Sequence, residues 1–186
     1  MEENSTTAAT ITEEEQRRYE ELQMMALDMA RAGETIELQK MLEAGMPVNL
    51  ADEKGNSLLM LASYNENPET TAMLIRLGAE IDERNDRGQT PLGGMAFKGN
   101  VEIARMLIDA GADLQANNGS GMTPLHYAKM FGRHKVAELL ESRGANYLAT
   151  VQGDAKSSSG GFALRIAEFF IKIRGLFGTG SKKARS

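Results

Sequence analysis

The side chains that could carry out chemistry are few in this chain. It has 186 residues, no cysteine and two histidines, His126 and His134. Without cysteine there is no disulfide, no thiolate zinc site and no cysteine nucleophile. No His-Glu-x-x-His motif surrounds either histidine, so the sequence does not indicate a histidine-based metal site. We therefore expect no catalytic residue, no metal ligand and no cofactor.

Phosphate-binding and nucleophile motifs are also missing. The sequence has no Gly-rich loop followed by lysine and no nucleophile elbow, and Gly119-Ser120-Gly121 is too short to hold a phosphate. An enzyme is therefore the least expected class of protein. Residues 1–150 contain 14 basic and 24 acidic side chains, and this acidic balance argues against nucleic-acid binding by that part of the chain.

One period dominates the sequence, because like residues recur every 33 positions. It is kept by glycines, hydroxyl residues and leucines, in the columns Gly55/Gly88/Gly121, Gly78/Gly111/Gly144, Ser57/Thr90/Thr123 and Leu59/Leu92/Leu125. A fixed period of this length indicates a repeat protein whose units stack on one another. A degenerate first copy precedes the clear ones, since Gly45 lies 33 residues before Gly78.

Each unit reads as two helices followed by a turn. Thr123 is a good N-cap, and Pro124 suits the first position of a helix. The second helix carries an apolar stripe, as Ile103 and Leu107 illustrate. Gly111 follows the last turn of that helix, where a left-handed residue is usual.

The motif Thr123-Pro124-Leu125-His126, together with the period, resembles the ankyrin-repeat family over residues 24–150. The resemblance implies an all-α solenoid that serves in protein–protein recognition or scaffolding. It also implies that His126 hydrogen-bonds within and between repeats. The sequence departs from the family pattern where Ser57-Leu58 replaces Thr-Pro, and where Met60 and Gly93 replace the motif histidine.

The resemblance also implies that partners contact the turn tips and the exposed face of the first helices. By register, the tip residues are Glu53, Lys54, Asn56, Asp86, Arg87, Gln89 and Met122, with Gly119 and Ser120 beside Met122, and the helix residues are Tyr64, Asn65, Phe97, Lys98, Met130 and Phe131. Tyr64, Phe97 and Met130 are each 33 residues apart and are expected to form a ladder on the concave surface. Surface clusters of aromatic residues and methionine are typical of binding sites. The alternative is that these side chains pack partly against neighbouring repeats.

The two ends of the chain differ from the repeats. Thr12 with Glu15 three residues later is a capping-box pattern, which predicts a helix from about residue 13 to 31. Residues 162–186 read as a basic amphipathic helix and tail, and the chain beyond residue 150 contains seven basic and two acidic side chains. Three alternatives remain open for this helix: it caps the last repeat, lies on an anionic membrane or docks on a protein partner.

These patterns predict four segments. They are a disordered N-terminus (1–11), an ankyrin-repeat domain (12–150), a flexible linker (151–161) and the basic tail (162–186), with repeats at about 12–50, 51–84, 85–117 and 118–150. No secretory signal and no apolar run of about 18 residues is seen, so we expect a cytoplasmic protein.

The expected function is that of a monomeric, non-catalytic scaffold that binds a protein partner, without nucleic acid or cofactor. Two alternatives remain. One is a peripheral membrane adaptor that makes weak surface contact through residues 162–186. The other is an accessory or effector protein acting on a partner enzyme or a host protein.

Overall fold

The computed structural model describes residues 12–119 and 121–147, and eight α-helices lie within these ranges. In chain order they are α1 (Glu13–Ala32), α2 (Thr35–Glu43), α3 (Leu58–Tyr64), α4 (Pro68–Arg76), α5 (Pro91–Lys98), α6 (Val101–Asp109), α7 (Pro124–Met130) and α8 (His134–Ser142). The predicted disordered N-terminus, the linker, the basic tail and Ser120 lie outside the described residues.

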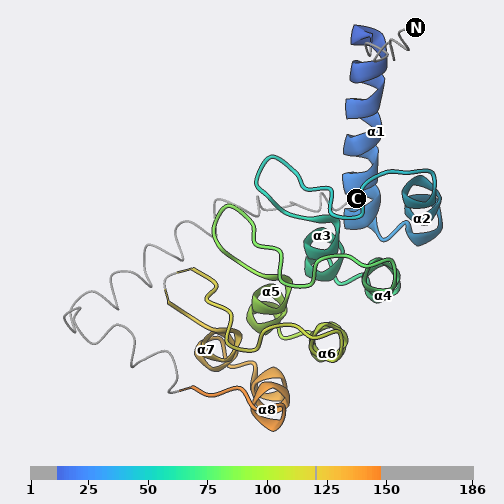
Figure 1. Ribbon diagram of the computed structural model, residues 1–186. Helices are drawn as coiled ribbons and strands as arrows, with labels where there is room; N and C mark the ends of the chain where they lie inside the picture. Colours follow the sequence, from blue (N-terminus) through green and yellow to red (C-terminus); the bar gives the residue numbers. More distant parts are fainter. Residues whose placement is uncertain (1–11, 120, 148–186) are drawn as a thin grey trace, which may run out of the picture. The chain divides into compact units, whose positions relative to one another are not determined.

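The helices form two layers (Figure 1). Helices α1, α3, α5 and α7 pack side by side in an inner layer, and α2, α4, α6 and α8 pack in an outer layer. Each inner helix also packs on the outer helix that follows it in the chain. The long turns that precede α3, α5 and α7 project beyond the inner layer (Figure 1). The expected all-α stack of two-helix units is thereby confirmed.

Each inner helix begins at a hydroxyl residue, as its sequence predicts. The side-chain oxygens of Thr12, Ser57, Thr90 and Thr123 accept from the backbone N–H three residues later, at 3.2, 3.3, 3.2 and 3.4 Å. Such a cap satisfies a backbone donor that has no partner within the helix. The predicted capping box of Thr12 and Glu15 is present, and α1 confirms the helix expected from about 13 to 31.

The core lies between the two layers and between successive repeats. Leu59, Leu92 and Leu125, which share one register position, are fully buried. Leu74 and Leu107 occupy the matching place on the outer helices and are also fully buried. Burying a leucine of this kind contributes roughly 1.5–3 kcal/mol relative to leaving it in water. Because each of these side chains needs the neighbouring repeat to cover it, stacking supplies the stability of the array.

Two polar contacts in the same register join the first repeat to the second and the second to the third. The side-chain oxygen of Asn49 accepts from the backbone N–H of Glu80 at 2.9 Å. One period later, Asp82 accepts from the N–H of Asp113, also at 2.9 Å. These contacts fix the spacing of successive turns, because a side chain of one repeat holds the backbone of the following one.

Candidate functional site

The turn before α3 is organised by a single carboxylate. Oδ1 of Asp52 accepts from the backbone N–H of Lys54 at 3.0 Å and from that of Asn56 at 2.9 Å. Burial raises the pKa of Asp52, but hydrogen bonds from Asn56, Lys54 and Arg31 outweigh it and leave the pKa below its ordinary value. We call residues 52–56 the first tip turn.

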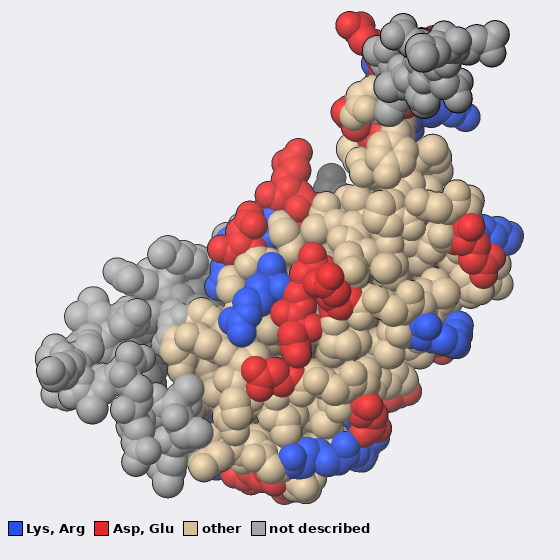
Figure 2. Space-filling model, in the orientation of Figure 1, with Lys and Arg blue, Asp and Glu red and all other residues tan. Residues whose placement is uncertain are grey.

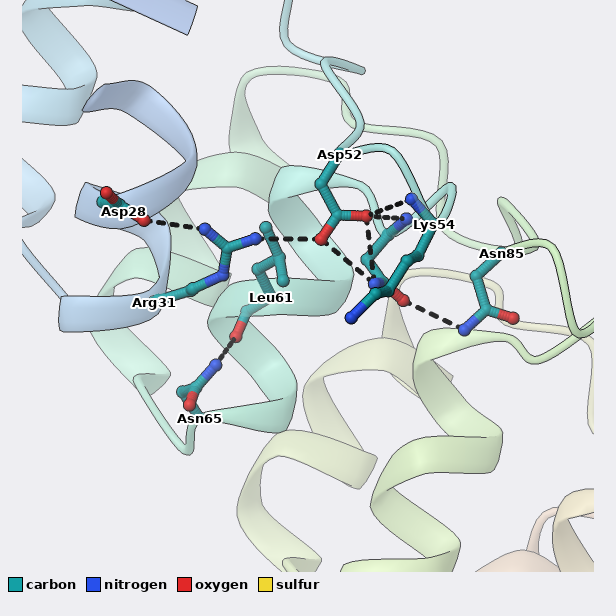
Figure 3. A network of polar contacts seen from close by, with 8 residues as sticks. Asp28, Arg31, Asp52, Lys54, Leu61, Asn65 and Asn85 are labelled. Atoms are coloured by element: carbon teal, nitrogen blue, oxygen red, sulfur yellow. Dashed lines mark hydrogen bonds and ion pairs between the residues drawn. The ribbon is translucent and has the colours of Figure 1, made fainter. Parts of the chain in front are cut away.

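The turn before α5 is built in the same way, and the two turns are joined. Oδ1 of Asn85 accepts from the N–H of Arg87 at 3.1 Å and from that of Gln89 at 3.0 Å, which defines the second tip turn, residues 85–89. The amide of Asn85 donates to Oδ1 of Asn56 at 3.0 Å (Figure 3). Asp86 N–H also donates to the Lys54 carbonyl at 3.0 Å, so side chains and backbone hold the two tips together.

Arg31 at the end of α1 ties the first helix to this network. Its guanidinium lies 2.7 Å from Oδ1 of Asp28 and 2.9 Å from Oδ2 of Asp52 (Figure 3). In the same view, Asn65 turns away from the tips and donates to the Leu61 carbonyl at 2.8 Å. The polar chain therefore runs from α1 through both tip turns.

The predicted tip residues divide into exposed and internal ones. The side chains of Glu53, Lys54, Asp86 and Arg87 are exposed, whereas Asn56 and Gln89 are half-buried. Met122 is only 6% exposed, so the expectation that it lies accessible at a tip is wrong. This methionine, next to the cap residue Thr123, fills space under the turn, because its long apolar side chain is more stable there than in water.

The residues predicted to be exposed on the inner helices are here called the inner-helix face, and they are Tyr64, Asn65, Phe97, Lys98, Met130 and Phe131. Tyr64, Phe97, Met130 and Phe131 are half-buried. The rings of Phe97 and Phe131 meet edge to face with centroids 4.6 Å apart. The alternative of partial packing between repeats therefore describes these side chains as well, and the contact runs diagonally rather than straight along the ladder.

Gly94 explains why the Tyr64 ring is half-buried on this face. A Cβ at Gly94 would come within 3.3 Å of Cδ2 of Tyr64, so the tyrosine ring occupies the space that a side chain at position 94 would take. The ammonium of Lys98 lies over the ring at 4.7 Å from its centroid. Burial, with a smaller effect of the charge on Glu66, raises the pKa of Tyr64 to about 12.

One feature that the sequence pattern did not predict is the group that takes over the contacts of the motif histidine in α5. In α7, Nδ1 of His126 lies 2.7 Å from Oγ1 of Thr123 and 3.3 Å from its backbone nitrogen. In α5 this place is taken by Asn118 of the following repeat, whose Oδ1 accepts from Thr90 N–H at 2.8 Å and from Thr90 Oγ1 at 2.9 Å.

Gly93 makes the substitution of acceptors possible. A Cβ at position 93 would overlap Oδ1 and Cγ of Asn118, so only glycine leaves room for the amide. Asn118 stands one period after Asn85 but turns inward, and its tip is held instead by Asn117, which accepts from Gly121 N–H at 3.1 Å. The combination of a glycine in the motif and an asparagine in the next turn is the sequence signal from which this cap could have been predicted.

The two histidines lie in different surroundings. His126 stacks on Tyr147 with ring centroids 4.4 Å apart, and burial and then the charge of Lys129 lower its pKa. His134 is exposed at the start of α8. Within residues 12–119 and 121–147, no three His, Cys, Asp or Glu side chains are grouped so that they could hold a metal ion. In the same ranges no helix is long and apolar enough to cross a membrane.

Comparison with known proteins agrees with this architecture. Residues 59–151 match the family model for ankyrin repeats (3 copies). A stretch of 46 residues is 46% identical to an ankyrin repeat protein of Pseudomonas aeruginosa, and it covers 25% of this chain and 27% of that relative's length. Ankyrin repeats are generally protein–protein interaction modules. The family model covers half of the sequence and matches the stacked helix pairs, and the chain therefore belongs to the ankyrin-repeat family.

Proposed function

We propose that this protein is a non-catalytic module that binds a protein partner with its tip turns and inner-helix face. The proposed recognition surface comprises residues 52–56, 64–66, 84–89, 97–98 and 130–133. The observation that carries the proposal is the combination of hydrogen-bonded tip turns with half-buried aromatic side chains on the inner-helix face.

The tip turns support the proposal because hydrogen bonds within the protein hold their backbone in place without a partner. In the first tip turn, Asp52 holds two backbone N–H groups and a guanidinium. In the second, Asn85 holds two further N–H groups and the neighbouring tip. A surface that is already ordered loses less conformational entropy on binding, and this favours affinity.

The inner-helix face supports the proposal through its composition. Phe97, Met130 and Phe131 present partly exposed apolar surface on neighbouring helices. Aromatic residues and methionine are enriched at the centres of protein interfaces, where they bury large areas. Lys98, which lies over Tyr64, adds a charge at the edge of this apolar area.

Affinity capture with matched variants tests the proposal. Tagged full-length protein is expressed in the source cells, and co-purifying proteins are quantified by mass spectrometry. The surface variant carries Phe97→Ala and Phe131→Ala. The control carries Ile36→Ala and Leu77→Ala, which remove equally apolar side chains that are 65% and 37% exposed and lie outside the recognition surface.

The expected result is a partner that the wild type and the control capture and that the surface variant loses. Circular dichroism and thermal unfolding establish that both variants remain folded. A folded surface variant that captures the same partner in the same amount contradicts the proposed surface.

A further inference from the structure

Charge is distributed unevenly over the described part of this acidic protein. Residues 12–119 and 121–147 contain 14 basic and 22 acidic side chains. The recognition surface holds five of the basic and four of the acidic ones, which leaves nine basic and eighteen acidic side chains elsewhere. Figure 2 shows carboxylate side chains gathered across the middle of the face in view. The recognition surface is thus slightly positive, whereas the rest of the described part carries a net charge of -9.

The acidic groups on the recognition surface are partly neutralised within the protein. Asp52 is paired with Arg31 at 2.9 Å, and Glu66 lies 4.0 Å from the ammonium of Lys98. The other two carboxylates of this surface, those of Glu53 and Asp86, form no ion pair with a described residue.

The basic groups of the same surface are mostly uncompensated. In the described part of the chain, no carboxylate lies within ion-pair distance of Lys54, Arg84, Arg87 or Arg133. Two of these arginines contact backbone oxygens instead: Arg84 donates to the Asn117 carbonyl, and Nε of Arg133 donates to that of Phe97 at 2.9 Å. Each guanidinium keeps further N–H donors for a partner.

We infer that the partner presents an acidic segment of polypeptide with apolar side chains, and this inference rests on the function proposed above. Its carboxylates pair with Lys54, Arg87 and Arg133, and its apolar side chains cover Phe97 and Phe131. The rest of residues 12–119 and 121–147 is strongly acidic and repels such a segment, so within this part of the chain charge directs the segment to the recognition surface. At physiological salt the screening length is about 8 Å, so the local cations outweigh the more distant acidic groups.

A random peptide library tests the inference even though the partner is unidentified. Phage that display random peptides of about 16 residues, long enough to span several packed helices, are selected on the immobilised full-length protein. Enriched peptides are synthesised with a fluorophore, and their affinities are measured by anisotropy at about 150 mM salt. An acidic single-stranded oligonucleotide is included as a competitor.

Three variants separate the contributions. The charge variant carries Lys54→Glu and Arg87→Glu, and its matched control carries Arg76→Glu and Arg105→Glu, which are exposed on outer helices. The apolar variant is again Phe97→Ala with Phe131→Ala. We expect the enriched peptides to carry a net negative charge and several apolar residues. The charge variant and the apolar variant should each bind these peptides about tenfold more weakly than wild type, and the affinity of the control should lie within about twofold of wild type.

The outcomes distinguish this inference from the proposed function. Enriched peptides that are neutral or basic but lose affinity for the apolar variant overturn the acidic partner and leave the binding surface intact. Peptides that bind the apolar and charge variants as well as wild type overturn both. If no peptide is enriched, the inference of an acidic partner segment is wrong. It is also wrong if the oligonucleotide displaces the peptides at equal concentration.

Discussion

Replacing Gly93 by alanine is the most direct test of how α5 is capped. In an exposed helix, alanine is more stable than glycine by about 0.8–1.0 kcal/mol, so propensity predicts stabilisation. The structure predicts the opposite sign. The added Cβ overlaps the amide of Asn118, which is 1% exposed and has no free space to enter. The amide must leave, and Thr90 loses the acceptor of both its N–H and its hydroxyl.

The size of the effect follows from the groups that lose their partner. A buried N–H without an acceptor costs about 1–3 kcal/mol, and the lost hydroxyl contact adds about 0.5–1.5 kcal/mol. The gain in helix propensity offsets at most about 1 kcal/mol. After that offset the net destabilisation is about 0.5–3.5 kcal/mol, equivalent to a fall in Tm of roughly 2–12 °C in a domain of this size.

Urea unfolding followed by circular dichroism measures this difference, with Gly94→Ala as the matched control. Position 94 belongs to the same helix, but its new Cβ would meet only Tyr64, nearest at Cδ2 at 3.3 Å, and that ring lies partly at the surface and can shift. We expect Gly94→Ala to change the free energy of unfolding by less than about 1 kcal/mol.

A double-mutant cycle decides whether Asn118 is the cause. In an Asn118→Ala background the obstruction is gone, so Gly93→Ala is expected to stabilise the protein by up to about 1 kcal/mol. The helix-propensity gain is the same in both backgrounds, so the coupling between the two positions equals the cost of the lost contacts, about 1.5–4.5 kcal/mol. A Gly93→Ala variant more stable than wild type, or two effects that simply add, would refute the reasoning.

Three further predictions concern the other contacts. Burial and Lys129 lower the folded-state pKa of His126 below the unfolded value of 6.5, so the stability that His126 contributes is full above pH 6.5 and falls as the pH drops through the folded pKa. The difference in Tm between wild type and His126→Gln, measured from about pH 7.5 to 5, should therefore shrink as the pH falls. Arg31→Ala should lower the free energy of unfolding by only about 0–1 kcal/mol for each partly exposed ion pair, and amide hydrogen exchange in residues 52–56 should become faster. Unchanged exchange in these residues would show that Asp52 holds the turn without Arg31. A double-mutant cycle of Phe97→Ala and Phe131→Ala should yield a coupling of about 0.5–1.5 kcal/mol in unfolding, and additivity would contradict the edge-to-face contact.

The sequence predicted the repeats well because their determinants are local. Thr123 and Pro124 cap a helix through their own chemistry, and the buried leucine column recurs in a fixed register. The first residue of α1 followed from Thr12 and Glu15 for the same reason.

The surface was harder to predict because its contacts join residues of different repeats. Met122 fits the register of a tip residue, yet it is buried under the turn. Tyr64 lies low because Gly94 on the next helix leaves it space. The inward turn of Asn118 depends on Gly93, twenty-five residues earlier, and no local propensity reports such a pair.

The cap of α5, which depends on Asn118 of the following repeat, has a consequence for how this array can evolve. The repeat that contains α7 carries its own motif histidine, so the contact to its cap residue Thr123 comes from within the repeat. The repeat that holds Gly93 depends on an asparagine encoded in the next one. Genetic recombination that separates the two leaves Thr90 without its acceptor, so this pair of repeats should be inherited together as a single unit.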